Sequence, residues 1–338
     1  MRGFKAQRTF GIFNITAALL ISLMSAPAII VAQNPATSDR AGQVDEQDDV
    51  VRVETNLVTV PASVMDRDGR YITNLKKEDF QIFENGIEQE VAFFASVEQP
   101  LTVLFLLDTS GSMSPYMVDL ARFANGFVSQ LRPDDQLTAA TFSDSAQVNV
   151  LFEATKAREL RKGVKLLPSS GDRNTMVYEA VDFALKRMKK IKGRKAIILF
   201  SDGIGTGVTA TANGNLRDAE KQDALVYTVQ FGTFPIEVPG YINKKYYFER
   251  IEEINGYMRN LARKTGGRHY QIKSISNLEE TFGQVAEELR RQYGLGYYPR
   301  GQLEAGQRRK IKVKVRLSKL VVRARDSYIV EKEIPKKN

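Results

Sequence analysis

Three hydrophobic patterns follow one another along the chain. From Val51 to Val97, short stretches alternate between apolar and polar residues and are separated by turn sequences, as in antiparallel hairpins. From Leu101 onward, continuous apolar runs alternate with segments whose apolar residues recur at helical spacing. After Tyr293 the strict alternation returns, most clearly from Lys310 to Leu317. The order of these patterns predicts an α/β segment between two β-rich segments.

The central segment is predicted to form a doubly wound, mostly parallel sheet with helices on both faces, because strands alternate there with helices of similar length. Strands are expected at Leu101 to Leu107, Leu137 to Phe142, Val148 to Phe152, Ala196 to Phe200, Leu225 to Phe231 and Tyr270 to Ile272. Helices are expected at Met117 to Leu131, Lys156 to Leu166, Val177 to Met188, Ile254 to Ala262 before a Gly266-Gly267 stop, and from a Ser276/Glu279 capping box to Leu289. Ligands of such sheets bind beyond the carboxyl ends of the strands.

The flanking segments are each too small to bury a core. Turn sequences at Asp66 to Gly69 and at Glu84 to Gly86 predict hairpins. An isolated pair of strands is marginally stable in water, so we expect the two ends to pair into one small antiparallel β-sandwich around the inserted α/β domain. Two separate β caps are the alternative. The expected division is a signal peptide (1–32), a flexible linker (33–50), the two sandwich halves (51–98 and 293–332), the α/β domain (99–292) and a tail (333–338).

The N-terminus has the pattern of a signal peptide. Positive residues precede an apolar run from Phe10 to Val31 and then small residues, with cleavage possible after Ala28 or Ala32. An uncleaved anchor is the alternative, but polar interruptions leave the run short of the roughly 20 apolar residues that span a bilayer. We therefore expect export to the periplasm, cell envelope or extracellular space, with no transmembrane segment after cleavage.

Composition narrows the functional classes. The chain has 338 residues, 43% of them hydrophobic, so it can bury a large core. The absence of cysteine excludes disulfides and thiol catalysis. The net charge of +9 is interleaved with acids and does not predict nucleic-acid binding. A basic sheet face is expected, either solvated or in contact with an anionic cell-surface polymer, from Lys312, Lys314, Arg316, Arg323 and Arg325.

Polar residues follow two of the predicted buried strands. The sequence Asp108-Thr109-Ser110-Gly111-Ser112 follows one, Ser201-Asp202-Gly203 follows another, and Gly171 to Thr175 precedes a helix between them. Carboxylate and hydroxyl oxygens on tight turns suit a hard divalent cation. The alternative is that Asp108 and the serines cap a helix. Three such loops at one sheet edge favour a metal site.

The three loops resemble the metal-ion-dependent adhesion site of von Willebrand factor type A domains, and the resemblance covers Leu101 to Gln292. It implies that Ser110 and Ser112 bind the metal through their hydroxyls, Thr175 directly or through water, and Asp108 and Asp202 directly or through a bridging water. It also implies an open coordination position for an exposed Asp or Glu of a protein partner. Mg²⁺ is the expected ion, with Mn²⁺ or Ca²⁺ as alternatives. The wider layout looks like bacterial secreted proteins related to this family.

An aromatic segment leaves the predicted sheet on the same edge. Its candidate ligand-binding rim consists of Phe234, Tyr241, Tyr246 and Tyr247. Packing of these side chains against the sandwich is the alternative. His269, the single histidine, has no partners for a catalytic triad and is interpreted as structural.

These features together predict an exported, non-enzymatic module that binds a protein at a divalent metal, in adhesion, assembly or scaffolding. A magnesium-dependent hydrolase is the competing class and fits less well, because no general base stands out. A structural envelope protein with a vestigial metal site is the third possibility.

Overall fold

The computed structural model describes residues 57–95, 99–143, 148–163, 175–203, 207–232 and 244–331, with the backbone alone at positions 244, 246, 247, 250 and 251. The predicted signal peptide, linker and tail lie outside the described residues. Within these ranges, no helix combines the length and the apolar character needed to cross a membrane.

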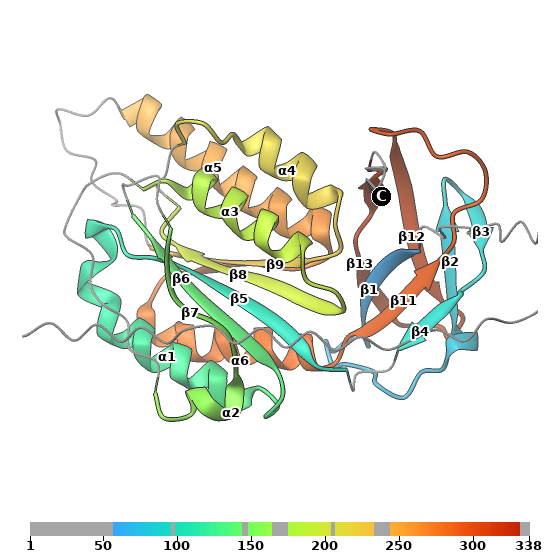
Figure 1. Ribbon diagram of the computed structural model, residues 1–338, viewed down its shortest axis with the longest axis horizontal. Helices are drawn as coiled ribbons and strands as arrows, with labels where there is room; N and C mark the ends of the chain where they lie inside the picture. Colours follow the sequence, from blue (N-terminus) through green and yellow to red (C-terminus); the bar gives the residue numbers. More distant parts are fainter. Residues whose placement is uncertain are drawn as a thin grey trace, which may run out of the picture. The chain divides into compact units, whose positions relative to one another are not determined.

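A six-stranded sheet forms the centre of the α/β part (Figure 1). Its strand order is β10–β9–β8–β5–β6–β7. The strands are β5 (Leu101–Asp108), β6 (Gln136–Phe142), β7 (Asn149–Lys156), β8 (Arg194–Ser201), β9 (Leu225–Phe231) and β10 (His269–Ile272). All pairings are parallel except that of β7 with β6. The predicted α/β fold class is therefore confirmed.

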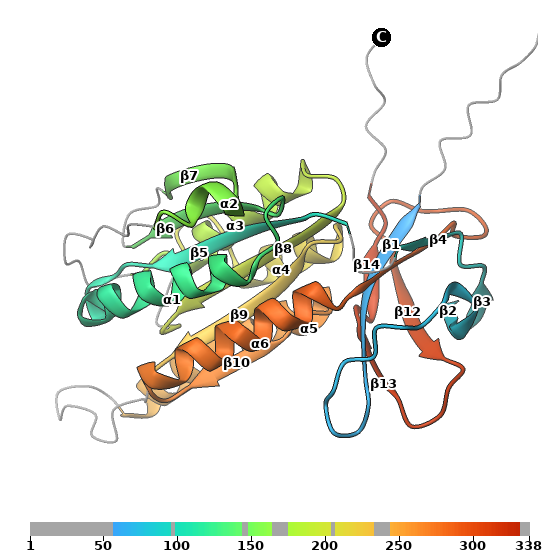
Figure 2. The same cartoon turned by 90° about the horizontal axis from the view of Figure 1, so that it is seen from below.

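Helices cover both faces of this sheet. They are α1 (Met117–Gln130), α2 (Ala157–Leu160), α3 (Val177–Lys189), α4 (Ala212–Glu220), α5 (Lys244–Thr265) and α6 (Leu278–Arg290). Helices α1 and α6 lie side by side on one face (Figure 2), where Phe127 and Phe282 pack edge-on against Phe105 of β5. Helices α3, α4 and α5 bury their apolar residues on the other face. Strand β5 is thus buried on both sides, as its continuous apolar run predicts.

Some local predictions are wrong. Helix α4 was not predicted, and the helix expected from Lys156 reduces to the single turn of α2, since Arg161 to Gly163 are not helical. Ser276 does not open α6: Ser274 accepts the N–H of Ser276 before a short 3-10 turn, η3 (Ile275–Asn277), and α6 begins after it. The glycine stop is confirmed, because α5 ends before Gly266, whose φ of 86° is favourable for glycine.

Strands from both ends of the chain form two four-stranded antiparallel sheets. The first has the order β13–β1–β11–β4 and the second β14–β12–β2–β3. The N-terminal strands are β1 (Val58–Met65), β2 (Phe80–Glu84), which follows the short turn η1 (Lys77–Asp79), β3 (Ile87–Gln89) and β4 (Phe93–Ala95). The C-terminal strands are β11 (Tyr293–Tyr297), β12 (Arg308–Val315), β13 (Val321–Ala324) and β14 (Ser327–Ile329). Figure 1 shows the two groups interleaved, and they share one core that includes Val60, Ile82, Leu295 and Ile311.

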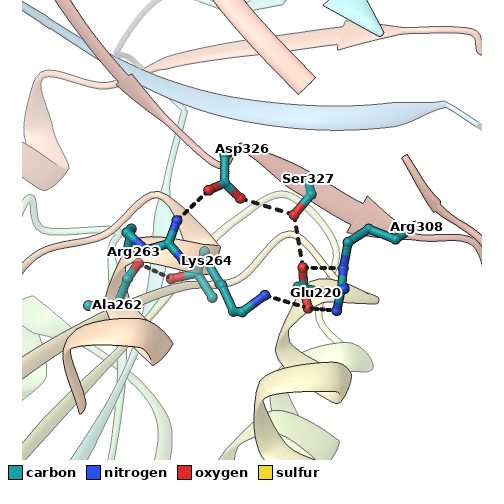
Figure 3. Close-up of polar contacts among 8 residues, drawn as sticks. Glu220, Ala262, Arg263, Lys264, Arg308, Asp326 and Ser327 are labelled. Carbon is teal, nitrogen blue, oxygen red and sulfur yellow. Dashed lines mark hydrogen bonds and ion pairs between the residues drawn. The ribbon is translucent and has the colours of Figure 1, made fainter. Parts of the chain in front are cut away.

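Two buried carboxylates join the α/β part to these antiparallel sheets. Glu220, at the end of α4, has a side chain that is 0% exposed. It accepts hydrogen bonds from Arg308 Nε (3.0 Å) and Nη2 (2.8 Å) and from Ser327 Oγ (2.8 Å), and Lys264 Nζ lies 3.0 Å away (Figure 3). Glu288 of α6, also 0% exposed, pairs with Arg323 at 3.0 Å. We call these two carboxylates and their partners the acidic seam.

Hydrogen bonds keep the first seam carboxylate charged. Burial alone would raise the pKa of Glu220, but the bonds from Arg308, Lys264 and Ser327 outweigh burial and lower it. Tyr71 and Ser63 donate to Glu288 at 3.1 and 3.3 Å, so the second carboxylate has several partners as well.

The predicted basic face is wrong for two of its five residues. Arg323 pairs with Glu288, and Arg325 is 5% exposed and donates to the carbonyl oxygens of Gln222 (2.9 Å) and Thr59 (2.6 Å). The sequence pattern predicted that both arginines face water. In the structure their side chains face the α/β part instead. The other three members, Lys312, Lys314 and Arg316, are exposed as expected.

Candidate metal site

Two neighbouring parallel strands bring the predicted carboxylates to one edge of the central sheet. Strands β5 and β8 pair in register through Leu107 and Phe200, so their next residues, Asp108 and Ser201, end the strands side by side. Ser201 Oγ donates to Asp108 Oδ2 at 2.5 Å. Asp202 follows directly and therefore lies at the same edge, as the topology of a parallel sheet requires.

Four of the five predicted metal residues form one hydrogen-bonded cluster. The N–H of Ser110 donates to Asp108 Oδ1 at 2.9 Å. The hydroxyls of Ser110 and Ser112 are 3.1 Å apart, and Ser112 Oγ donates to Asp202 Oδ2 at 2.5 Å. Ser112 itself lies in a 3-10 turn, η2 (Gly111–Tyr116), which leads into α1. Ser112 and Asp202 are 90 positions apart in the sequence, yet their side-chain oxygens converge at this edge of the sheet.

Helix capping does not explain this arrangement. Ser110 stands at the N-cap of η2 but makes no side-chain capping bond, and the N-cap of α1 is Tyr116. The serine hydroxyls point instead to each other and to the carboxylate of Asp202.

Thr175 lies at the same edge but outside the hydrogen-bonded cluster. It is 3% exposed and stands two residues before α3. The N–H of Met176 donates to the carbonyl of Ser143, which follows β6, at 2.8 Å, and the N–H of Thr109 donates to the carbonyl of Phe142. These backbone bonds bring the β6 end, the start of α3 and the loop after β5 together.

The electrostatics of the cluster suit a divalent cation. Burial, and then the nearby charge of Asp202, raise the pKa of Asp108 to about 7, against hydrogen bonds from Ser201 and Ser110 that lower it. A cation between the two carboxylates would remove this repulsion. In the described ranges, no three His, Cys, Asp or Glu side chains gather around a common point, so the donors here are two carboxylates and neutral hydroxyls. All-oxygen donors fit Mg²⁺, Mn²⁺ or Ca²⁺.

Sequence patterns did not single out several residues that support the cluster. Ser201 lies within the motif, and its hydroxyl fixes Asp108. Gln230, which is paired with Ser201 across β8 and β9, donates to the carbonyl of Asp202 (3.3 Å) and to Asn255 Oδ1 (2.5 Å). The supporting role of Gln230 follows only from the strand order, because Gln230 is far from the motif in the sequence.

Glu179 holds the backbone of the segment that follows the Asp202 loop. Its Oε1 accepts the N–H groups of Val208, Thr209 and Ala210 at 2.5, 2.9 and 3.2 Å. Although burial raises the pKa of Glu179, these bonds lower it more, so the carboxylate stays charged.

Substitution of Gly203 by alanine should destabilise this edge of the sheet by about 1–2 kcal/mol. Gly203 has a φ of 84°, and an added Cβ would lie 2.8 Å from Gln230 Nε2 and 3.0 Å from Ile254 Cγ2. Chemical denaturation would measure the change. Gly69, which also has positive φ but open space around it, provides the control: G69A carries the backbone strain without the contacts, so equal losses for both variants would contradict the packing argument.

The predicted rim cannot be placed from side chains. Phe234 and Tyr241 lie outside the described residues, and Tyr246 and Tyr247 belong to the first turn of α5, of which the backbone is described. The rim therefore stays a prediction.

His269 begins β10, and its Nδ1 lies 2.9 Å from Thr228 Oγ1. Burial, followed by the charge of Arg259, lowers its pKa to about 4, so the ring is neutral at pH 7.

The von Willebrand factor type A domain family matches residues 102–284, more than half of the chain. The chain belongs to this family. Among curated proteins, none matches it.

Three solved structures illustrate what the chain is similar to. A conserved hypothetical protein, BatB, from Bacteroides thetaiotaomicron is 18% identical, with 56% of this chain and 98% of that chain covered and a TM-score of 0.40. A von Willebrand factor type A protein from Catenulispora acidiphila is 12% identical, with 75% and 74% covered and a TM-score of 0.44. Proximal thread matrix protein 1 of the mussel byssus, with a zinc-occupied MIDAS motif, is 14% identical, with 62% and 50% covered and a TM-score of 0.47. The chain spans half the length of the mussel protein.

Proposed function

We propose that this protein is a non-enzymatic binding module that captures an acidic side chain of a protein partner at one divalent cation, with Mg²⁺ as the expected ion. The observation that carries the proposal is the cluster of Asp108, Ser110, Ser112 and Asp202 at one sheet edge. Thr175 would add a hydroxyl, directly or through water.

The charge of the site explains why it suits ligand capture. Two carboxylates only balance a divalent ion, and the remaining donors are neutral hydroxyls, so a bound cation would offer a Lewis-acidic position to a partner's Asp or Glu. The chain's own residues orient this position: Ser201 fixes one carboxylate of the site and Gln230 fixes the backbone beside the other.

Binding fits the described residues better than hydrolysis. The two metal-loop carboxylates are engaged in the cluster, and His269 is buried, neutral and bonded to Thr228. A hydrolase needs a positioned base for its attacking water, and none of the described side chains beside the cluster is arranged for that role.

We also propose that the protein is exported and acts in adhesion, assembly or scaffolding outside the cytoplasm. The signal-peptide pattern of residues 1–32 carries this part of the proposal.

Metal binding and partner binding should both require Asp108. Wild-type protein is expected to gain thermal stability with added Mg²⁺, by about 2.7 kcal/mol at a hundredfold excess over the dissociation constant, because the ion binds only the folded state. D108A should lose this gain. D134A, which removes an exposed carboxylate beside Lys156 and Arg158 at the opposite end of β6, should keep it. Scanning fluorimetry at several Mg²⁺ concentrations measures both.

Capture from the parent cell's envelope tests the functional half of the proposal. Partner proteins should bind wild type and D134A, be released by chelator, return with Mg²⁺ or Mn²⁺, and be missing with D108A. A wild-type protein that binds no divalent ion would indicate a vestigial site. Capture that persists in excess chelator would exclude the metal mechanism, and Mg²⁺-dependent phosphoester turnover lost in D108A would favour the hydrolase.

A further inference from the structure

The stretch from Ala305 to Arg325 is unusually basic. It contains nine Lys or Arg residues and no acid among 21 positions. The structure separates the cations that stabilise the fold from those that are exposed and could bind a ligand.

Four of the nine cations are bound at the acidic seam, beside Glu84 or to carbonyls next to the α/β part. Arg308 and Arg323 pair with the two carboxylates of the acidic seam. Arg309 lies 3.4 Å from Glu84, which is 2% exposed, and Arg325 donates to two backbone carbonyls. These four arginines are explained by packing and need no external ligand.

The other five cations are exposed, although Arg316 Nε donates to the carbonyl of Glu78 at 3.1 Å: Lys310, Lys312, Lys314, Arg316 and Lys319. We call them the basic strip. On β12, the intervening side chains of Ile311, Val313 and Val315 point into the core between the antiparallel sheets, so the even-numbered cations share the outward face. Alternate residues of a strand are roughly 6.5–6.8 Å apart, so Lys310 to Arg316 form a row about 20 Å long.

Little in the surroundings neutralises the basic strip. Glu88 is the one carboxylate paired with it among the described residues, at 3.8 Å from Arg316 Nη2, and it also accepts from Gln81. Lys314 Nζ lies 4.8 Å above the ring of Phe83, which pairs across strands with Lys312. A row of like charges does not stabilise its strand, and an extended polyanion along the row would replace mutual repulsion by attraction.

We propose that the basic strip binds a linear acidic polysaccharide. The row of evenly spaced, exposed cations matches a chain with repeated carboxylate groups. Single-stranded nucleic acid is a poorer match, because such sites use several aromatic side chains as stacking platforms. In the part of the chain that the structure describes, Phe83 is the one aromatic ring in contact with the strip, and Lys314 covers it. This binding is independent of the proposed metal site.

Alginate, a linear polysaccharide with one carboxylate per sugar, is the test ligand, and dextran is its neutral counterpart. Full-length protein should bind alginate, not dextran, and bind it less tightly as NaCl rises, because salt screens exposed charges. Each cation close to an anionic surface strengthens binding by about fivefold, so K312Q/K314Q should weaken binding by about 25-fold. Biolayer interferometry on immobilised alginate would measure these affinities.

The matched control is K190Q/K192Q. Lys190 and Lys192 are exposed residues in the turn after α3, and this double variant changes the net charge by the same amount. It should bind alginate within about twofold of wild type. D108A and chelator should also leave alginate binding unchanged, which separates this proposal from the metal-dependent one.

Several outcomes would overturn the assignment. Equal losses in the two double variants would show a net-charge effect without a site, and absence of alginate binding at low salt would exclude the ligand class. Strip-dependent binding that is tighter for oligo-dT or for phosphatidylglycerol vesicles than for alginate would reassign the basic strip to nucleic acid or to a membrane surface.

Discussion

Alanine at position 220 is expected to lower the free energy of unfolding by about 3 kcal/mol. The Glu220 side chain is fully buried and is bonded to Arg308, Lys264 and Ser327 (Figure 3). Removal of one partner of a buried ion pair costs about 3–5 kcal/mol, because the remaining charges lose their compensation. We expect a loss at the lower end of this range, because the side chain of Arg308 is 54% exposed and can turn toward water. Urea denaturation followed by circular dichroism would measure the loss.

The control for E220A is an exposed ion pair of similar geometry. Lys186 and Asp182 are 2.7 Å apart on α3, with side chains 74% and 29% exposed. Pairs of this kind contribute about 1 kcal/mol or less, so D182A should be nearly neutral. A loss below about 1 kcal/mol for E220A would mean that the acidic seam holds the two parts of the protein no more strongly than a surface contact does.

Parts of the fold were predictable because their signals are local. The continuous apolar runs of β5, β8 and β9 indicated strands buried on both faces, and the structure buries nearly every residue in them. The alternation in β12 likewise placed Ile311 toward a core. A strand buried on one face has alternating apolar and polar residues, and a strand buried on both faces has a continuous apolar run, so both can be predicted from the sequence.

Helix α4 was missed because its stability is not local. Its sequence contains Gly214 and two asparagines, which are poor helix formers. Tertiary contacts hold it instead: Asn215 donates to the carbonyl of Tyr178 and to the hydroxyl of Tyr257, and Glu220 belongs to the acidic seam. None of these partners is adjacent in sequence, so no window of the chain could reveal them.

The same limit applies to charged residues. Arg308 and Lys310 look alike in the alternating sequence, yet the first pairs with a carboxylate 88 positions away and the second is solvent-exposed. At the candidate metal site the motif predicted which oxygens could converge, and Asp108, Ser110, Ser112 and Asp202 do so. The supporting Gln230 depends on the strand order and was therefore not foreseen.

Truncation after Gln292 should unfold the N-terminal strands while the α/β part stays folded at lower stability. The deletion removes β11 and β13, both neighbours of β1, and β12, which pairs with β2. The remaining β2–β3 hairpin is too small to be stable alone. The six-stranded sheet keeps all its strands, but Glu220 and Glu288 lose their arginines, so its melting temperature should fall.

Limited proteolysis with mass spectrometry would follow this truncation directly. Cleavage should appear rapidly between residues 57 and 95, where the full-length protein is expected to resist, because proteases cut chains that lack stable local structure. Fragments from 101 to 290 should persist. A truncation after Glu331 is the matched control, since it keeps every described strand and the ion pair between Lys189 and Glu331. It should resist cleavage like the full chain. If residues 57–95 stayed equally protected without the C-terminal strands, the two ends would not depend on each other, even though they pair strand by strand and share one core.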